Sequence, residues 1–249
     1  MQILGIIPAR YASTRFPAKA LHMIEGKSMV QRVYEQATQA SSLKEVVIAT
    51  DHLAIYNHVK DFGGQVLMTS EQHPSGTDRC MEALQKIGKD TYDYVINIQG
   101  DEPFIQPAQI DTLAQVLANR SVEIATLMKK IHDPEDLSDL NKVKITFNTQ
   151  YEALYFSRQA IPAVRQVVPE AWLQHADFYK HIGMYAYRKD ILEKITALSP
   201  SRLEQLECLE QLRWLENGFK IKLAITELDS FCIDVPEDLT HIALKKFLN

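Results

Sequence analysis

The chain has 249 residues, of which 46% are hydrophobic, and its formal net charge is -5 at pH 7. This length and composition suffice for one large α/β domain or two smaller ones with a sizeable core. The acidic balance argues against a nucleic-acid partner or an anionic membrane surface, because both require a basic face. No apolar stretch reaches the length of a membrane span, so we expect a cytoplasmic protein without a membrane partner.

The three cysteines, Cys80, Cys208 and Cys232, are widely spaced and form no CxxC pair. This spacing predicts neither a disulfide framework nor a zinc site. We therefore expect small buried side chains at these positions.

The first predicted element is a buried strand over residues 3–7, which leads into a polar loop over residues 9–19. Arg10, Arg15 and Lys19 lie in this loop among small and turn-forming residues. Backbone N–H groups and cationic side chains in such a loop favour a polyphosphate ligand, and a nucleoside triphosphate is the first candidate. A basic loop that is merely solvated is the alternative interpretation.

Three further apolar runs, residues 46–50, 65–68 and 94–98, alternate with segments of helical period. This alternation predicts an α/β fold with a mostly parallel central sheet flanked by helices. Polar clusters follow each run, and the carboxyl ends of parallel strands meet at one edge of a sheet. We therefore expect these clusters to share one crevice.

After a strand at residues 124–127 the alternation weakens, and residues 143–147, 153–156 and 182–187 read as an antiparallel addition. A helix is predicted from about residue 203 to residue 217. Ser201 and Glu204 have the spacing of a capping box at its start, and Gly218 ends it.

Residues 75–79 mark a loop that enters a helix, with Thr77 or Asp78 as the expected N-cap. The N-terminus of such a helix offers backbone donors to an anion or a base carbonyl, and Arg79 could add a bidentate contact. An ordinary capped helix is the competing interpretation.

Asp101 follows an apolar strand and is the first candidate for a Mg²⁺ ligand, since this ion takes one or two protein carboxylates and completes its shell with phosphate oxygens and water. Asp234 stands between Ile233 and Val235, where an unpaired carboxylate is costly to bury. It is interpreted either as a helix N-cap or, together with Asp101, as a second metal ligand.

His181 and Tyr185 are four residues apart, which places them on one face of a strand, where they could bind a polyhydroxylated substrate. Glu204, Glu207 and Gln211 form one polar stripe on the predicted helix. This stripe fits a sugar pocket, a subunit boundary or simply the solvated side.

Several separate motifs occur in one order over nearly the whole chain: Ile7–Arg15 with Pro17 and Lys19, Ala49–Asp51, Ser75–Arg79, Asn97–Pro103, Tyr155–Arg158, His181–Tyr185 and Leu209–Arg213. In this set the chain closely resembles the 3-deoxy-manno-octulosonate cytidylyltransferases, also called CMP-Kdo synthetases. The resemblance implies a Rossmann-like nucleotidyltransferase fold, a homodimer, a Mg²⁺ cofactor and the conversion of CTP and Kdo to CMP-Kdo and pyrophosphate for lipopolysaccharide assembly.

The resemblance also assigns roles by position. The expected CTP-binding residues are Ala9, Arg10, Lys19, Ser75, Arg79 and Gln99. The expected sugar-binding residues are Arg15, Gln99, Arg158, Arg165, His181, Tyr185, Glu204 and Gln211, with Arg158 or Arg165 on the sugar's carboxylate. The expected catalytic residues are Arg10, Lys19, Asp101 and Asp234, of which the two aspartates hold the metal ion.

The resemblance implies a single domain over residues 1–249, with a nucleotide-binding part to about residue 128. A smaller antiparallel part for sugar binding and dimerisation is expected over about 129–220, and about 221–249 returns to the core and supplies a metal ligand. In one place the chain departs from the family, which commonly has Pro-Gly-Lys-Pro where this chain has Pro17-Ala18-Lys19-Ala20. Ala18 restricts the dihedral angles of the loop without removing a side-chain contact.

In the implied reaction the 2-hydroxyl of Kdo attacks the α-phosphorus of CTP in line, without a dedicated protein base. Two alternatives stay open at this point. One is a cytidylyltransferase for another sugar acid, such as a sialic acid or an amino analogue of Kdo. The other is a non-catalytic subunit that binds nucleotide sugars.

Overall fold

The computed structural model describes residues 1–12, 16–229, 231–233, 235 and 238. The chain forms two compact units, residues 1–114 with the described residues after 229, and residues 115–229. From the sequence we expected the first part of the domain to end near residue 128 and the chain to return to it near residue 221. The strand over residues 124–130 belongs to the second unit because both of its partner strands in that unit follow it in the chain.

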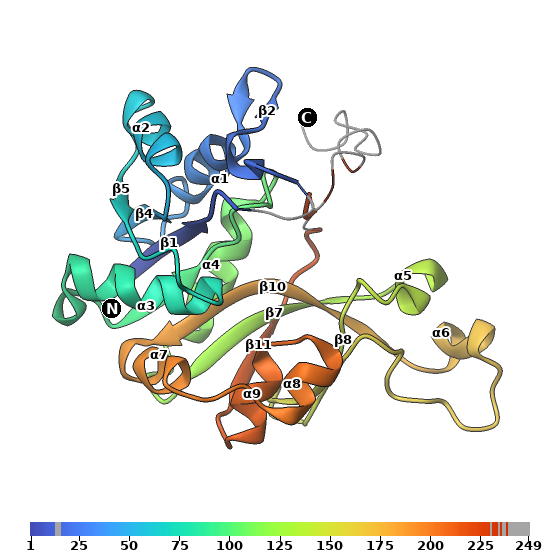
Figure 1. Ribbon diagram of the computed structural model, residues 1–249. Coiled ribbons are helices and arrows are strands. Elements are labelled where there is room, and N and C mark those ends of the chain that lie inside the picture. Colours follow the sequence, from blue (N-terminus) through green and yellow to red (C-terminus); the bar gives the residue numbers. More distant parts are fainter. Residues whose placement is uncertain (13–15, 230, 234, 236–237, 239–249) are drawn as a thin grey trace. The chain divides into compact units, whose positions relative to one another are not determined.

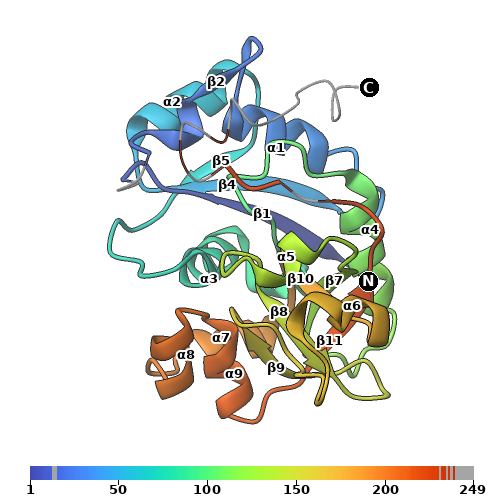
Figure 2. The same cartoon turned by 90° about the vertical axis from the view of Figure 1, so that its right-hand side faces the viewer.

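The first unit contains a parallel sheet in the order β6-β1-β4-β5, as the alternating pattern predicts. Its strands are β1 (Ile3–Ala9), β4 (Glu45–Thr50), β5 (Val66–Met68) and β6 (Tyr94–Asn97). Helices cover both faces, since Figure 2 shows α1 and α2 on one side of these strands and α3 on the other. β1 is consequently buried along almost its whole length, and each fully buried Ile side chain contributes about 1.5–3 kcal/mol.

The helices of this unit begin where the sequence supplies caps and apolar stripes. They are α1 (Met29–Ala37), α2 (Leu53–Asp61), α3 (Gly76–Ile87) and α4 (Pro107–Val116). In α1 the Ser28 hydroxyl accepts a hydrogen bond from the N–H of Gln31, 3.2 Å away, which satisfies a free donor of the first turn. The shorter elements are η1 (Lys19–Leu21), β2 (Met23–Ile24), β3 (Lys27–Ser28) and η2 (Lys89–Thr91).

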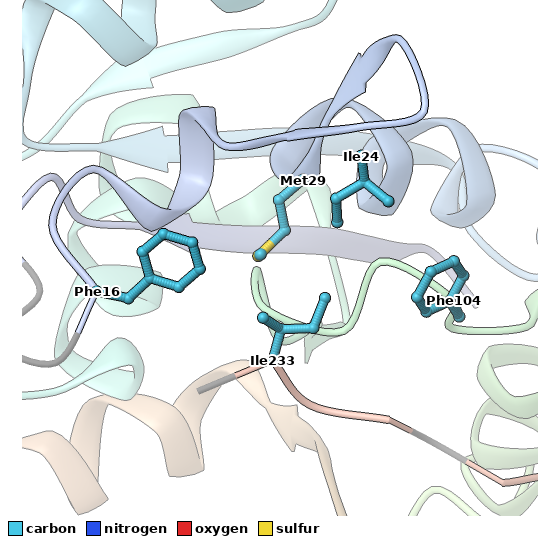
Figure 3. Packing of buried hydrophobic residues seen from close by; sticks show 5 residues of the cluster. All are labelled: Phe16, Ile24, Met29, Phe104 and Ile233. Carbon is cyan, nitrogen blue, oxygen red and sulfur yellow. The ribbon is translucent and has the colours of Figure 1, made fainter. Parts of the chain in front are cut away.

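A small apolar cluster packs Ile233 against the rest of this unit (Figure 3). Its buried members are Phe16, Ile24, Met29, Phe104 and Ile233. The backbone N–H of Ile233 also donates to the carbonyl oxygen of Asp101, at 2.9 Å. Both contacts fix the peptide of Asp101 against the C-terminal segment.

The second unit is built on strands β7 (Ile124–Lys130), β8 (Lys144–Phe147), β9 (Ala153–Ser157), β10 (Tyr179–Arg188) and β11 (Ile221–Ile225). β10 pairs antiparallel with β7 and β8, and β9 continues this antiparallel part. β11, which the sequence pattern does not predict, pairs parallel with β7. Its helices are α5 (Pro134–Ser138), η3 (Pro169–Ala171), α6 (Trp172–His175), α7 (Lys189–Thr196), α8 (Arg202–Glu207) and α9 (Gln211–Glu216). Figure 1 shows α7, α8 and α9 gathered on one side of this sheet.

The single helix predicted over residues 203–217 is wrong, because the chain forms two helices there, α8 and α9. Cys208 adopts the left-handed region with φ 51°, which ends α8. Glu204, Glu207 and Gln211 therefore form no stripe on one helix. Gly218, with φ 81°, follows α9 as predicted.

The three cysteines are free thiols, as predicted, but only Cys80 is buried. Cys208 and Cys232 are exposed, so the expectation of buried side chains is wrong for these two. Within the part of the chain that the structure describes, no helix combines the length and apolar character that a membrane crossing requires.

Candidate active site

A cavity of about 310 Å³ lies in the first unit, at the carboxyl ends of β1 and β6 and beside the start of α3. It brings together the residues that were expected to bind CTP and one expected metal ligand: Ala9, Arg10, Lys19, Ser75, Arg79, Gln99 and Asp101. The rest of the lining consists of residues that were given no binding role from the sequence: Pro8, Ala20, Gly76 and Gly100, which lie in or beside the quoted motifs, and His73 and Pro74, which do not. The cavity therefore forms at the sheet edge where open α/β folds bind ligands.

Two glycines allow the walls of the cavity to approach one another. A Cβ atom on Gly100 would lie 2.7 Å from the carbonyl oxygen of Pro8, and one on Gly76 would lie 3.2 Å from the Pro8 ring. A side chain at Gly100 would therefore push the exit of β1 away from the segment that carries Asp101.

Lys19 and Asp101 form an ion pair in the cavity, with 2.7 Å between Lys19 Nζ and Asp101 Oδ2. Their side chains are 15% and 26% exposed, so both are within reach of a ligand. Arg10 is exposed at the same rim. A cation beside a carboxylate is suited to a ligand that brings both phosphate oxygens and a divalent ion.

Ala18 adopts φ 53° and ψ 28° immediately before η1. This left-handed conformation costs a residue with a Cβ atom about 1–2 kcal/mol, and glycine adopts it freely. We predict that Ala18→Gly relieves this strain and stabilises the protein. The gain should be about 1 kcal/mol or less, because glycine loses more conformational entropy on folding than alanine does. Urea denaturation of both proteins tests this prediction, and a clear destabilisation would contradict it.

α3 begins at the cavity with Ser75 as its N-cap. The Ser75 hydroxyl accepts from the N–H of Asp78 at 3.2 Å, and it donates to the Asp78 carboxylate at 2.6 Å. The expected caps Thr77 and Asp78 are therefore wrong by two or three positions. Because the helix starts at Gly76, its first-turn N–H groups and positive dipole end lie at the cavity lining.

Both terminal nitrogens of the Arg79 guanidinium, which the sequence suggested for a bidentate ligand contact, bind acceptors of the protein itself. Its side chain is 4% exposed, and one guanidinium nitrogen donates to Thr69 Oγ1 at 2.6 Å and to the Ser70 carbonyl at 3.1 Å. The other donates to Asp51 Oδ2 at 2.8 Å, and Asp51 Oδ1 accepts from the N–H of Tyr11 at 3.0 Å. Arg79 thus connects the end of β4, the loop after β5 and the loop after β1.

The two neighbouring carboxyl groups after β6 have different surroundings. Asp101 lines the cavity, whereas Glu102 is only 5% exposed. Burial, with a smaller contribution from the charge of Asp101, raises the pKa of Glu102 to about 8. The geometry therefore favours Asp101 over Glu102 as the ligand of a cation.

Two of the expected sugar-binding residues, His181 and Tyr185, lie on one face of β10, as predicted. They pair with Met128 and Thr126 of β7 across a bulge, and their ring centroids are 5.1 Å apart. His181 Nε2 lies 2.9 Å from Thr126 Oγ1. The Tyr185 hydroxyl is buried and has no hydrogen-bond partner among the described residues. Burial and the charge of Glu210 raise the pKa of Tyr185 well above its usual value.

Desolvation lowers the pKa of His181 to about 3, so its ring is neutral in the folded state at neutral pH. The unfolded chain takes up a proton near pH 6.5, and stability therefore falls as the pH drops from about 6.5 towards 3. One such group contributes a slope of about 1.4 kcal/mol per pH unit at most. We predict that the unfolding free energy of His181→Gln declines less steeply with falling pH. Urea denaturation at several pH values tests this, and parallel curves for the two proteins would contradict it.

The other expected sugar-binding residues of the second unit have dissimilar surroundings. Arg158 donates to the carbonyl oxygens of Leu140, Glu207 and Cys208, whereas Arg165 is exposed and has no partner among the described residues. Gln211 is 5% exposed. The Glu204 carboxylate accepts hydrogen bonds from Arg213 and from the N–H of Ser201.

Arg15 and Asp234, a predicted sugar-binding residue and a predicted metal ligand, lie outside the described residues. Within the described ranges, no group of three or more His, Cys, Asp and Glu side chains could hold a metal ion. This finding is compatible with Mg²⁺, because that ion needs only one or two protein carboxylates when phosphate oxygens complete its shell. Asp101 fits such a role.

Parallel strands that end at a cationic cavity, with a helix N-terminus and a carboxylate in its lining, are the arrangement of a nucleotide-binding α/β enzyme. The family model described as cytidylyltransferase matches residues 4–221, and the chain belongs to this family. The protein is thus a nucleotidyltransferase, and the comparisons confirm the fold class and the family resemblance that the motifs indicated.

The chain is 54% identical over 243 residues to the 3-deoxy-manno-octulosonate cytidylyltransferase of Cytophaga hutchinsonii, covering 97% of this chain and 96% of the relative. It is 46% identical over 243 residues to the 8-amino-3,8-dideoxy-manno-octulosonate cytidylyltransferase of Shewanella pealeana, with 96% of each chain covered. A solved structure of CMP:2-keto-3-deoxy-manno-octonic acid synthetase complexed with CTP is 38% identical, with a TM-score of 0.91 over 99% of both chains.

Proposed function

We propose that the protein transfers the cytidylyl group of CTP to Kdo, releasing pyrophosphate and forming CMP-Kdo. The observation that carries this proposal is the cavity that joins Arg10, Lys19, Ser75 and Asp101 at the edge of the parallel sheet. The names of the relatives and the CTP complex of the similar structure support the choice of CTP and Kdo.

The residues of the cavity divide the work of phosphoryl transfer. Arg10 and Lys19 bind the triphosphate and stabilise the charge that builds on the transferred and leaving groups, an effect that is worth about 3–4 kcal/mol for one well-placed donor. The N-terminus of α3 adds backbone donors. We assign no protein base to the attacking hydroxyl, because in-line transfer to phosphorus depends mainly on positioning and charge neutralisation.

Cytidylyltransferases of this kind generally use a divalent metal ion. We propose that the ion is Mg²⁺ and that Asp101 and Asp234 hold it. Such an ion lowers the pKa of a coordinated hydroxyl and neutralises phosphate charge.

For the sugar acid we propose Gln99 in the first unit, the second-unit residues Arg158, Arg165, His181, Tyr185 and Gln211, and Arg15. The unpartnered Tyr185 hydroxyl supports this assignment, because a buried hydroxyl without a partner is costly unless a ligand supplies one. Arg165 has its guanidinium available for a carboxylate, whereas three carbonyl oxygens already bind that of Arg158. Glu204 stays the weakest candidate, because Arg213 binds its carboxylate.

We further propose that the protein works as a homodimer in the cytoplasm and supplies activated Kdo for lipopolysaccharide. The family resemblance supports each of these statements. Light scattering on the purified protein tests the dimer, and a monomeric mass would contradict it.

Pyrophosphate release tests the function directly. Purified protein with Mg²⁺ receives each ribonucleoside triphosphate, with Kdo, 8-amino-Kdo or a sialic acid as acceptor. Release that requires both CTP and Kdo supports the proposal. Release with 8-amino-Kdo alone would favour the specificity that the Shewanella pealeana relative is named for. Silence in every combination would return a non-catalytic subunit to consideration.

A further inference from the structure

One wall of the cavity is the segment over residues 69–75, which connects β5 to α3. It supplies His73, Pro74 and Ser75 to the lining. Residues before a proline are restricted to extended conformations, so Pro74 limits the backbone freedom of His73. The side chain of His73 is 20% exposed, which leaves part of the ring accessible at the cavity.

Glu82, on α3, holds the His73 ring in place. His73 Nε2 forms a short hydrogen bond with Glu82 Oε2, and the same oxygen accepts from the N–H of Ser70 at 2.8 Å. Lys86 pairs with the other carboxylate oxygen at 2.7 Å. Burial alone would raise the pKa of Glu82, but the hydrogen bonds from Lys86, Ser70 and His73 lower it to about 2. Glu82 is therefore ionised at neutral pH.

An ionised carboxylate only accepts hydrogen bonds, so Nε2 of His73 must carry a proton and donate it to Glu82. This contact fixes the orientation of the ring, as the outer partners of functional histidines commonly do. Nδ1 is then the remaining polar atom of the ring, and it has no hydrogen-bond partner among the described residues. A polar atom on an oriented ring at a binding cavity is suited to contact a ligand.

We propose that His73 is a nucleotide-binding residue that contacts the nucleoside triphosphate through Nδ1, and that Glu82 is its positioning residue. The inference rests on the proposed function and adds two residues to the same site. It explains why the Glu82 carboxylate on α3 binds both the His73 ring and the N–H of Ser70 in the loop before the helix.

Nucleotide binding measured by calorimetry, without the sugar acid, tests the inference. His73→Phe keeps an aromatic ring and removes both nitrogens, and we expect it to weaken CTP binding by up to about tenfold, as the loss of one hydrogen bond accepted by Nδ1 from the nucleotide does. Glu82→Gln keeps an acceptor for Nε2 but loses the charge, so a smaller loss of about threefold is expected. Lys86→Gln is the matched control, because it removes a partner of Glu82 that does not contact His73, and its binding should equal that of the wild type.

Steady-state kinetics separates binding from a merely structural role. We expect the KM for CTP to rise in His73→Phe while the KM for the sugar acid, kcat at saturating CTP and the melting temperature stay close to wild type. CTP binding by His73→Phe within twofold of the wild type would overturn the inference while leaving the proposed function intact. A wild-type protein that binds none of the four ribonucleoside triphosphates would overturn both.

Discussion

Replacing Asp101 with asparagine is expected to lower kcat by about a thousandfold or more, because metal and charge effects at a transferring phosphoryl group supply several kcal/mol. The amide has the shape of the carboxylate but no charge, so it would bind a divalent cation far more weakly. Pyrophosphate release at saturating CTP and Kdo measures the loss.

The same substitution should leave the fold intact, because the Asp101 side chain is 26% exposed and its main structural tie is the carbonyl that accepts from Ile233. Asp61→Asn is the matched control, since Asp61 is exposed at the end of α2 and lies outside the cavity. Its activity should equal that of the wild type. Manganese binding in the presence of CTP gives a second readout, and near-normal activity or metal binding in Asp101→Asn would contradict the assignment.

The sequence predicts the parallel half of the fold well, because each of its strands is an apolar run that helices cover on both faces. β11 was not predicted from the sequence, because the run Ile221–Ile225 is short and directly follows a helix stop, and nothing in the sequence shows that this strand joins β7. The division of the last helical segment depends on Cys208, whose left-handed conformation has no sequence signal of the kind that glycine gives.

The lining of the cavity was predictable where residues follow strand ends, since topology brings those ends together. His73 could have been found in the same way, because it lies between the end of β5 and the Ser-Gly start of α3, two positions before Ser75. The role of Asp51 was not predictable, because its partners Tyr11 and Arg79 are brought together only by folding. Arg79 itself was assigned from its type and position, and sequence alone does not show how many protein acceptors surround it.

The buried pair of Arg79 and Asp51 carries the second large expectation. Arg79→Met would leave the Asp51 carboxylate buried without its cation, and Asp51→Asn would leave the guanidinium without its anion. Breaking one side of a buried ion pair costs about 3–5 kcal/mol, because the remaining charge has lost its compensation. Each single substitution should lower the unfolding free energy by that order, as measured by urea denaturation.

The double substitution separates the stability of the pair from its function. With both charges removed, no uncompensated charge is buried. The loss of unfolding free energy in the double variant should therefore be smaller than the sum of the two single losses by about 0.5–3 kcal/mol. Strictly additive costs would show that the two side chains do not interact in solution.

Restored stability should not restore nucleotide binding in the double variant. Thr69 and Ser70 would lose the Arg79 guanidinium from which both accept hydrogen bonds, so the loop after β5 would no longer be joined through Asp51 to Tyr11 in the loop after β1, and the cavity walls would no longer be held at one spacing. Arg79→Lys sharpens this point, because a single ammonium keeps the charge but does not reach all three acceptors of the guanidinium fork. We therefore expect the KM for CTP to rise in the double variant and in Arg79→Lys alike. A wild-type KM in Arg79→Lys would show that the charge alone shapes the site, and a wild-type KM in the double variant would show that neither the charges nor the network does.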